Sequence, residues 1–245
     1  MTNQKLKGKV ALITGASAGI GRACALSLAK SGADLVITAR RGERLKEIEE
    51  QVQKYDVKVV SIIGDAQEEK TARECVKKAV ATFERIDILI NNVGIGNYKD
   101  LIDTSSGDYD EMMNTNVRST FLFSRYTVPQ MINQKSGIIL MISSMAGKYG
   151  FAGEAVYCAT KFAQVGFAQA LDKELRPHGI KVGSICPGGV KTEFALGKGR
   201  TENSVSESGM LEPEDVAEAV LLACTQSSIS RIIEIQMRTM HEALT

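Results

Sequence analysis

Residues 10–21 read VALITGASAGIG, and this stretch decides the fold. Its first five residues are apolar or β-branched and predict a buried strand. Its three glycines permit a tight turn, and residues 19–31 continue with the pattern of a helix that stops at Gly32. A strand that passes through a glycine turn into a helix is typical of a βα unit in a parallel sheet.

Short β-branched runs alternate with longer helical patterns along the rest of the chain. The predicted strands are Val10–Thr14, Leu35–Thr38, Val57–Ile63, Ile86–Ile90, Ile138–Ser143, Lys181–Ile185 and Ile232–Met237. The predicted helices cover residues 19–31, 41–55, 67–83, 106–134, 154–176 and 213–225. With right-handed crossovers, this order predicts an α/β protein: a single doubly wound Rossmann domain over residues 1–245, with a parallel seven-stranded sheet and helices on both faces.

The composition excludes several classes of protein. The chain has 245 residues, 44% of them apolar and 24% charged, with a formal net charge of +1. It lacks the basic excess of a nucleic-acid binder and the low hydrophobicity of a disordered chain. No run approaches the roughly 20 apolar residues of a spanning helix, and the N-terminus is polar. We expect a cytoplasmic protein without membrane or nucleic-acid partners, which binds small molecules or copies of itself.

Cysteine and histidine offer little chemistry. The five cysteines never form a C-x-x-C pair, so we expect buried thiols in a reducing compartment, with neither disulfides nor a zinc site. His178 and His241 alone give little material for a metal site or a Ser-His-Asp hydrolase. No metal is therefore expected.

The glycine turn predicts a dinucleotide site, because the helix that follows it presents backbone N–H groups to a pyrophosphate. The second strand ends in Thr38-Ala39-Arg40-Arg41. An acid at this place favours NAD, whereas an arginine favours the 2'-phosphate of NADP. We predict NADP(H), with Arg40 as the preferred contact. The alternative is that both arginines belong to a solvated helix start.

Asp65 follows the third predicted strand, at the sheet edge where α/β proteins bind ligands. Its carboxylate could accept a hydrogen bond from an adenine amino group. Capping of the helix that starts near Gln67 is an equally good interpretation.

Tyr157 and Lys161 lie four residues apart at the start of a predicted helix and share one face. A free phenol has a pKa of about 10, and a nearby ammonium lowers it toward the range of an acid–base catalyst. Such a pair alone is unspecific, since in most sequences it decorates the surface. Ser144, at the end of the fifth strand, adds a hydroxyl for the same substrate oxygen. The alternative role for Ser144 is capping of the turn that follows.

Taken together, these motifs resemble the short-chain dehydrogenase/reductase family over nearly the whole chain. The shared pieces, in family order, are Thr14-Gly-x-x-x-Gly-x-Gly21, Asp65, Asn91-Asn92-Val93-Gly94, Asn116, Ser144, Tyr157-x-x-x-Lys161 and Pro187-Gly188-Gly189-Val190-Lys191-Thr192. The resemblance implies four catalytic roles: Tyr157 as general acid and base, Lys161 lowering its pKa and binding the nicotinamide ribose, Ser144 orienting the carbonyl, and Asn116 holding a helix kink and a water. It pairs Ser17 with Arg40 at the 2'-phosphate. The implied cofactor contacts are Gly15, Ser17, Gly19, Ile20, Gly21, Arg40, Arg41, Asp65, Ala66, Asn92, Val93, Gly94, Tyr157, Lys161, Pro187, Gly188, Val190 and Thr192.

Two positions depart from the family pattern. Val93 stands where alanine is usual, a tolerable addition beside the cofactor. The last strand, residues 232–238, lacks the Asp-Gly-Gly typical of reductases that act on acyl carrier protein. The ending looks more like NADP-dependent 3-hydroxy acid and serine dehydrogenases or carbonyl reductases.

The resemblance implies an NADP(H)-dependent oxidoreductase that acts on the CH-OH group of a small carbonyl or alcohol substrate, as a homodimer or homotetramer. The first alternative is a 3-oxoacyl-acyl-carrier-protein reductase. The second is a non-catalytic NADP(H) sensor, against which all four candidate catalytic residues are present.

Residues 195–210 form a long non-periodic stretch and are expected to be the substrate-binding loop. The expected pocket walls are residues 95–98, 146–151, Glu154 and 194–210, with few fixed charges. Lys148 is a candidate for attracting a carboxylate, with a solvated loop lysine as the alternative.

Overall fold

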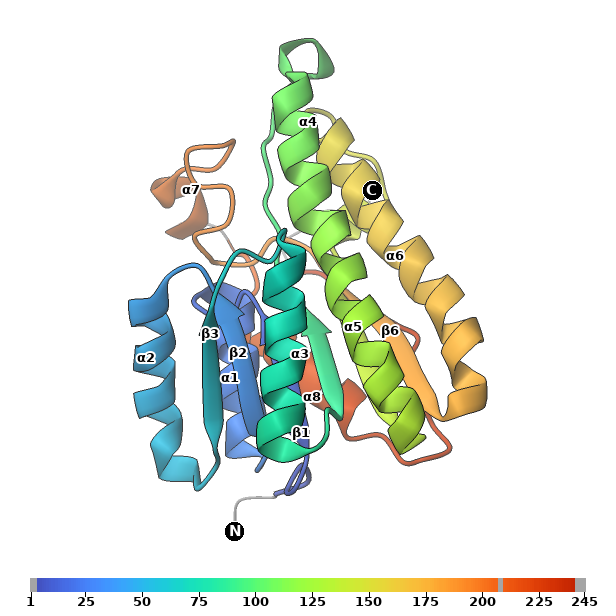
Figure 1. Ribbon diagram of the computed structural model, residues 1–245. Helices are drawn as coiled ribbons and strands as arrows, with labels where there is room; N and C mark the ends of the chain where they lie inside the picture. The colour runs from blue at the N-terminus through green and yellow to red at the C-terminus, as the bar shows by residue number, and fades with distance from the viewer. Residues whose placement is uncertain (1–3, 207–208, 241–245) are drawn as a thin grey trace.

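Seven parallel strands form the centre of the molecule, in the order β3-β2-β1-β4-β5-β6-β7 (Figure 1). The computed structural model describes residues 4–206 and 209–240. The predicted doubly wound α/β fold is confirmed. The strands are β1 Val10–Thr14, β2 Asp34–Ala39, β3 Val59–Ile63, β4 Ile88–Asn91, β5 Gly137–Ile142, β6 Ile180–Pro187 and β7 Glu234–Met237.

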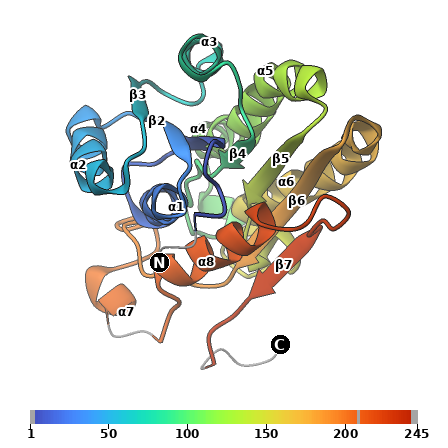
Figure 2. The ribbon, with the colours of Figure 1, turned by 90° about the horizontal axis from the view of Figure 1, so that it is seen from below.

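Helices cover both faces of the sheet (Figure 2). On one face lie α1 Gly19–Lys30, α2 Gly42–Val52 and α8 Pro213–Cys224, and on the other α3 Glu69–Phe83, α5 Ser119–Gln134 and α6 Ala155–Leu175. Successive side chains of a strand point to opposite faces. In β2, Leu35 and Ile37 accordingly join the apolar core under α1 and α8, whereas Val36 joins the core under α3 and α5.

The helix predicted over residues 106–134 is divided into three parts. α4 (Ser106–Met112) is followed by a π-helical segment, Met113–Arg118, before α5 begins. A π turn accommodates an extra residue in the helix and is frequent at functional sites. The outer bounds of the predicted helix, 106–134, are confirmed, but the apolar pattern continues across the wider turn and did not predict the π-helical segment.

The other differences are smaller. The stretch expected to be a loop over residues 195–210 contains a short helix, α7 (Glu202–Ser206), although residues 207 and 208 lie outside the described residues. β7 begins at Glu234, two residues after the predicted start. Short 3-10 turns cover Gln53–Tyr55, Leu101–Asp103, Met145–Gly147 and Arg176–His178. All five cysteines are buried and free, as expected.

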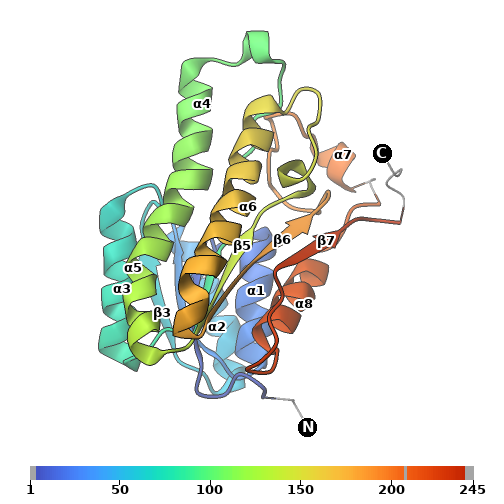
Figure 3. The same ribbon diagram turned by 90° about the vertical axis from the view of Figure 1, so that its right-hand side faces the viewer.

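The strand order places the candidate site. β1 pairs with β2 on one side and β4 on the other, so the chain leaves these neighbouring strands in opposite directions. A crevice forms at the carboxyl edge of a sheet at such a switch point. The chain after β6, including α7, lies beyond this same edge (Figure 3). Within the part of the chain that the structure describes, no helix is both long and apolar enough to cross a membrane.

Candidate active site

A cavity of about 670 Å³ runs along the carboxyl edge of the sheet. It is lined by the turn after β1, the ends of β2 and β3, the segment after β4, the start of α6 and the segment after β6. Of the residues predicted for the site, all but Gly21 and Asn116 line it. The fold thus gathers residues that are far apart in the sequence around one cavity.

The turn after β1 is built so that its backbone comes close to the cavity. Gly15 has a φ of 65°, a left-handed conformation that favours glycine. At Gly21 a Cβ atom would lie 2.3 Å from the carbonyl oxygen of Gly15, so no larger residue fits. α1 has no side-chain cap and no acid in its first turn. The N-terminus of α1 therefore presents backbone donors and partial positive charge to an anionic group.

Asn92 holds this turn from the neighbouring strand. Its Nδ2 donates to the carbonyl oxygens of Thr14 (3.0 Å) and Gly15 (3.1 Å). The Thr14 hydroxyl in turn accepts from the backbone N–H of Asn92 (2.9 Å). The predicted cofactor residue Asn92 thus shapes the glycine turn in addition to lining the cavity.

The end of β2 carries a cluster of charged groups around Ser17. Arg41 donates to the Ser17 hydroxyl (3.2 Å) and to the Glu193 carboxylate (2.8 Å), and Arg44 donates to the same carboxylate (2.7 Å). These hydrogen bonds from Arg41 and Arg44 hold the pKa of Glu193 below its usual range. Arg41 and Arg44 thus already bind an anion, the carboxylate of Glu193.

The pairing of Ser17 with Arg40 at a 2'-phosphate stays a prediction. In this structure Arg41 contacts Ser17, whereas the Arg40 guanidinium lies 3.9 Å from Asp65 and is largely exposed. Asp65 also accepts a hydrogen bond from the backbone N–H of Gln67 at 3.0 Å. The turn-capping role of Asp65 is therefore present, and its carboxylate still lines the cavity.

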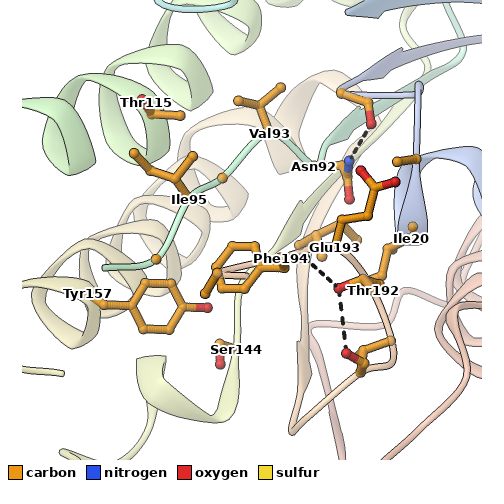
Figure 4. Close-up of a pocket in the computed structure, with 18 of the residues that line it drawn as sticks. Ile20, Asn92, Val93, Ile95, Thr115, Ser144, Tyr157, Thr192, Glu193 and Phe194 are labelled. Carbon is orange, nitrogen blue, oxygen red and sulfur yellow. Dashed lines mark hydrogen bonds between the residues drawn. The ribbon is translucent and has the colours of Figure 1, made fainter. Parts of the chain in front are cut away.

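The reaction end of the cavity centres on Tyr157 of α6. Its ring packs against those of Tyr98 (centroids 5.6 Å apart) and Phe194 (5.7 Å). Tyr157 and Ser144 lie on the same side of the cavity, with the phenol oxygen on the side of Ser144 (Figure 4). Burial raises the pKa of Tyr157 and the nearby Tyr98 adds to this, while a hydrogen bond with Ser144 lowers it. Ser144 also accepts from the backbone N–H of Ala146 (3.1 Å), so it caps the turn as well.

Lys161 lies one helical turn from Tyr157, with its Nζ 5.7 Å from the centre of the Tyr157 ring. The ammonium donates to the Ile142 carbonyl (3.0 Å) and to Oε1 of Gln164 (2.9 Å), and burial lowers the pKa of Lys161 to about 8. Burial is the largest influence on the pKa of Tyr157 and raises it, while the influences that lower it come from a hydrogen bond with Ser144 and the charge of Arg200. The expected lowering of this pKa by Lys161 stays a prediction.

Asn116 lies in the π-helical segment, fully buried behind the cavity. Its Oδ1 accepts from the backbone N–H of Ile95 (2.8 Å), and its Nδ2 donates to the Ile95 carbonyl and to the Thr160 hydroxyl, both at 2.9 Å. Asn116 thus joins the segment after β4 to α6, which carries Tyr157. The side chain is in place to position the site rather than to line it.

The sequence analysis missed the contacts of Arg44 and Glu193. Arg44 does not itself line the cavity, but its contact could have been found, because it lies three residues after Arg41 and so shares a helix face with it. Glu193 belongs to the segment after β6, which gives no signal for where its side chain points. Arg200 lies in the expected pocket wall, residues 194–210, and lines the cavity. Lys148, the candidate for binding a carboxylate, instead forms an ion pair with Glu234 (3.0 Å) and does not line the cavity.

Comparisons with known proteins agree with this geometry. The family model described as short chain dehydrogenase matches residues 9–203. A 3-oxoacyl-acyl-carrier-protein reductase of Aquifex aeolicus is 34% identical, covering 91% of this chain and 92% of that protein. An NADP-dependent 3-hydroxy acid dehydrogenase of Schizosaccharomyces pombe is 36% identical over 91% of this chain and 89% of its own.

A solved structure gives the same result at the level of the fold. A metagenomic short-chain oxidoreductase in complex with NADP superimposes with a TM-score of 0.84 and 31% identity, covering 97% of this chain and 100% of the other. The family model, the sequence relatives and the sheet topology all indicate the same family. This chain belongs to the short-chain dehydrogenase/reductase family of oxidoreductases.

Proposed function

We propose that this protein is an NADP(H)-dependent oxidoreductase that interconverts a carbonyl and an alcohol, with Tyr157 as general acid and base. The observation that carries the proposal is the single cavity that joins the glycine turn to Ser144, Tyr157 and Lys161. The backbone-lined turn and the N-terminus of α1 fit the pyrophosphate of a dinucleotide. NADPH, when bound, supplies the hydride.

The side chains divide the remaining work. In reduction, the Tyr157 hydroxyl gives its proton to the carbonyl oxygen while the hydride adds to the carbonyl carbon; in oxidation, the phenolate takes that proton back. Ser144 donates to the same oxygen and stabilises the charge that develops there. A tyrosine whose pKa is raised by burial stays protonated at neutral pH, which suits the donor role in reduction.

The test is the variant Tyr157→Phe, which removes the transferable proton and retains the ring. General acid–base catalysis contributes about a hundredfold to ten-thousandfold, so kcat should fall by that factor. The affinity for NADPH, measured by fluorescence titration, should stay within about twofold, because the ring still fills its place. Turnover close to that of the wild type would contradict the assignment.

The preference for NADP(H) is proposed from the cluster at Ser17. Arg41 and Arg44 already hold a carboxylate, and a 2'-phosphate offers the same charge-assisted hydrogen bonds. Arg41→Ala should weaken NADPH binding about tenfold or more and NADH binding little. Arg40→Ala is the matched comparison. If Arg41→Ala lost affinity equally for NADPH and NADH, Arg41 would have no role at the 2'-phosphate.

The substrate is proposed to be a small carbonyl or alcohol compound, with residues 195–210 as the substrate-binding loop. The two sequence relatives act, by their names, on acyl carrier protein and on 3-hydroxy acids, and their identities of 34% and 36% do not separate these alternatives. A panel of aldehydes, ketones, oxo acids and 3-oxo esters with NADPH tests the proposal. Binding of NADPH without reduction of any of them would favour the non-catalytic sensor.

A further inference from the structure

Arg200 carries a positive charge into the reaction end of the cavity. Its Cζ lies 5.8 Å from the centre of the Tyr98 ring and 5.7 Å from that of Phe194. Both rings also pack against the ring of Tyr157. The guanidinium therefore lies one ring away from the proposed acid–base residue, on the wall that faces the substrate space.

The other cations that line the cavity already have partners. Arg41 is paired with Glu193, Lys198 with Glu111, and Arg40 faces Asp65, while Lys161 donates to uncharged oxygens. In residues 4–206 and 209–240, Arg200 makes no ion pair; its NH1 donates a long hydrogen bond, 3.4 Å, to the Val190 carbonyl, and the guanidinium also interacts with the Tyr98 hydroxyl. A half-buried guanidinium without a carboxylate partner is available to a ligand that carries one.

The guanidinium of Arg200 lies within cation–π distance of both rings. Its remaining N–H groups form a planar fork that matches a carboxylate. Glu154, before α6, lines the same cavity and interacts electrostatically with Arg200. Burial raises the pKa of Glu154, and the charge of Arg200 acts in the opposite direction.

We propose that Arg200 binds a carboxylate on the substrate, so that the enzyme acts on short oxo acids and the corresponding hydroxy acids. This inference rests on the proposed function. The carboxylate is unchanged in the reaction: NADPH gives its hydride to the ketone carbon, and the ketone oxygen takes the proton of Tyr157. The products are the hydroxy acid and NADP⁺, so Arg200 determines substrate choice and takes no part in the proton transfer.

The experiment compares each acid with its neutral ester. Acetoacetate and levulinate, and their methyl esters, are reduced with NADPH by the wild type, Arg200→Met, Arg200→Lys and Glu154→Gln. The wild type should prefer the acids. Arg200→Met should raise KM for the acids about tenfold to a hundredfold, the effect of losing a charged hydrogen bond, and change KM for the esters by less than about threefold. For Arg200→Lys, KM for the acids should lie between the values of the wild type and Arg200→Met, because lysine keeps the positive charge and lacks the planar fork of N–H groups.

Two further variants separate charge from loop structure. Glu154→Gln should lower KM for the acids and leave the esters unaffected, because it removes the opposing carboxylate; this result does not depend on Arg200→Met being folded. Lys148→Met, a nearby cation that is already paired with Glu234, should affect acids and esters alike.

The outcomes distinguish this inference from the proposed function. Equal effects of Arg200→Met on acids and esters, or a wild type that reduces esters and no acid, would overturn the role of Arg200 and leave the reductase proposal standing. Reduction of no carbonyl compound at all would overturn the proposed function, and this inference with it.

Discussion

Aromatic rings, more than charges, surround the phenol of Tyr157. Tyr98 and Phe194 exclude water from it, and Ser144 is the hydroxyl that opposes the effect of burial on its pKa. In this arrangement the protonated phenol is favoured and the phenolate has to be stabilised by a small number of contacts. Under the proposed mechanism, reduction uses the phenol and oxidation uses the phenolate, so the direction of catalysis should depend strongly on pH.

Ser144→Ala tests this dependence. Removal of the hydroxyl takes away an influence that lowers the pKa of Tyr157, so that pKa should rise further. Alcohol oxidation increases with pH as the phenol ionises, and its midpoint should move up by about one pH unit, equivalent to about 1.4 kcal/mol. The pH profile of kcat/KM for oxidation is the measurement. Ser144→Thr retains a hydroxyl and should keep the midpoint, and an unchanged midpoint in Ser144→Ala would contradict the contact.

The sequence predicted most of the residues around the cavity because their types and order are tied to backbone geometry. Gly15 needs its left-handed φ, and Tyr157 and Lys161 share a face because of helical spacing. The contacts that Arg41, Glu193 and Arg200 make are different. These contacts depend on side-chain rotamers and on the path of a non-periodic segment, for which the sequence has no repeating pattern.

At the scale of elements, the π-helical segment between α4 and α5 shows the same limit. The apolar pattern predicted one helix, because a single extra residue barely disturbs that pattern. The π-helical segment nevertheless has a specific consequence. It carries Asn116, whose side-chain amide forms hydrogen bonds with both the backbone N–H and the carbonyl of Ile95.

Asn116→Ala should destabilise the fold, because it leaves the N–H and carbonyl of Ile95 unpaired at a partly buried place. A fully buried group without a partner costs about 1 to 3 kcal/mol, so two partly buried groups should lower the free energy of unfolding by about 2 to 4 kcal/mol. Urea denaturation measures this change. Asn114→Ala, an exposed position in the same segment, is the control and should stay within about 0.5 kcal/mol of the wild type. Similar losses in both variants would assign the effect to the helix turn instead of to the amide.

The segment after β6 is joined to α2 through Glu193, which lies between Arg41 and Arg44. A 2'-phosphate that binds these arginines has to displace this carboxylate. Glu193→Gln removes the competing charge, so NADPH should bind several times more tightly, while NADH, without the phosphate, should change little. Titration of the same variant with both cofactors provides its own control. Weaker NADPH binding would show that Glu193 supports the site instead of competing for it.

At the scale of the whole molecule, two apolar layers enclose the sheet, and both bury thiols. Cys24 and Cys224 lie in the core formed by α1 and α8, and Cys75 in the core on the other face. Burial raises the pKa of Cys24 and of Cys75 to about 12, and it raises that of Cys224 as well. The tight packing that positions the site therefore also holds these thiols in the protonated form.

Alkaline pH should consequently unfold the protein at lower denaturant concentrations. Above the ordinary thiol pKa of about 8.5, the unfolded chain loses protons that the folded chain keeps, so the stability present below that pH is lost as pH rises toward about 12. Each thiol contributes up to about 1.4 kcal/mol per pH unit in that window. Urea denaturation between about pH 8 and about pH 10, under reducing conditions, measures the slope. Cys24→Ala should start less stable, because it leaves a small cavity, and yet lose stability less steeply with pH. Curves that run parallel for this variant and the wild type would mean that Cys24 ionises alike in the folded and unfolded chains.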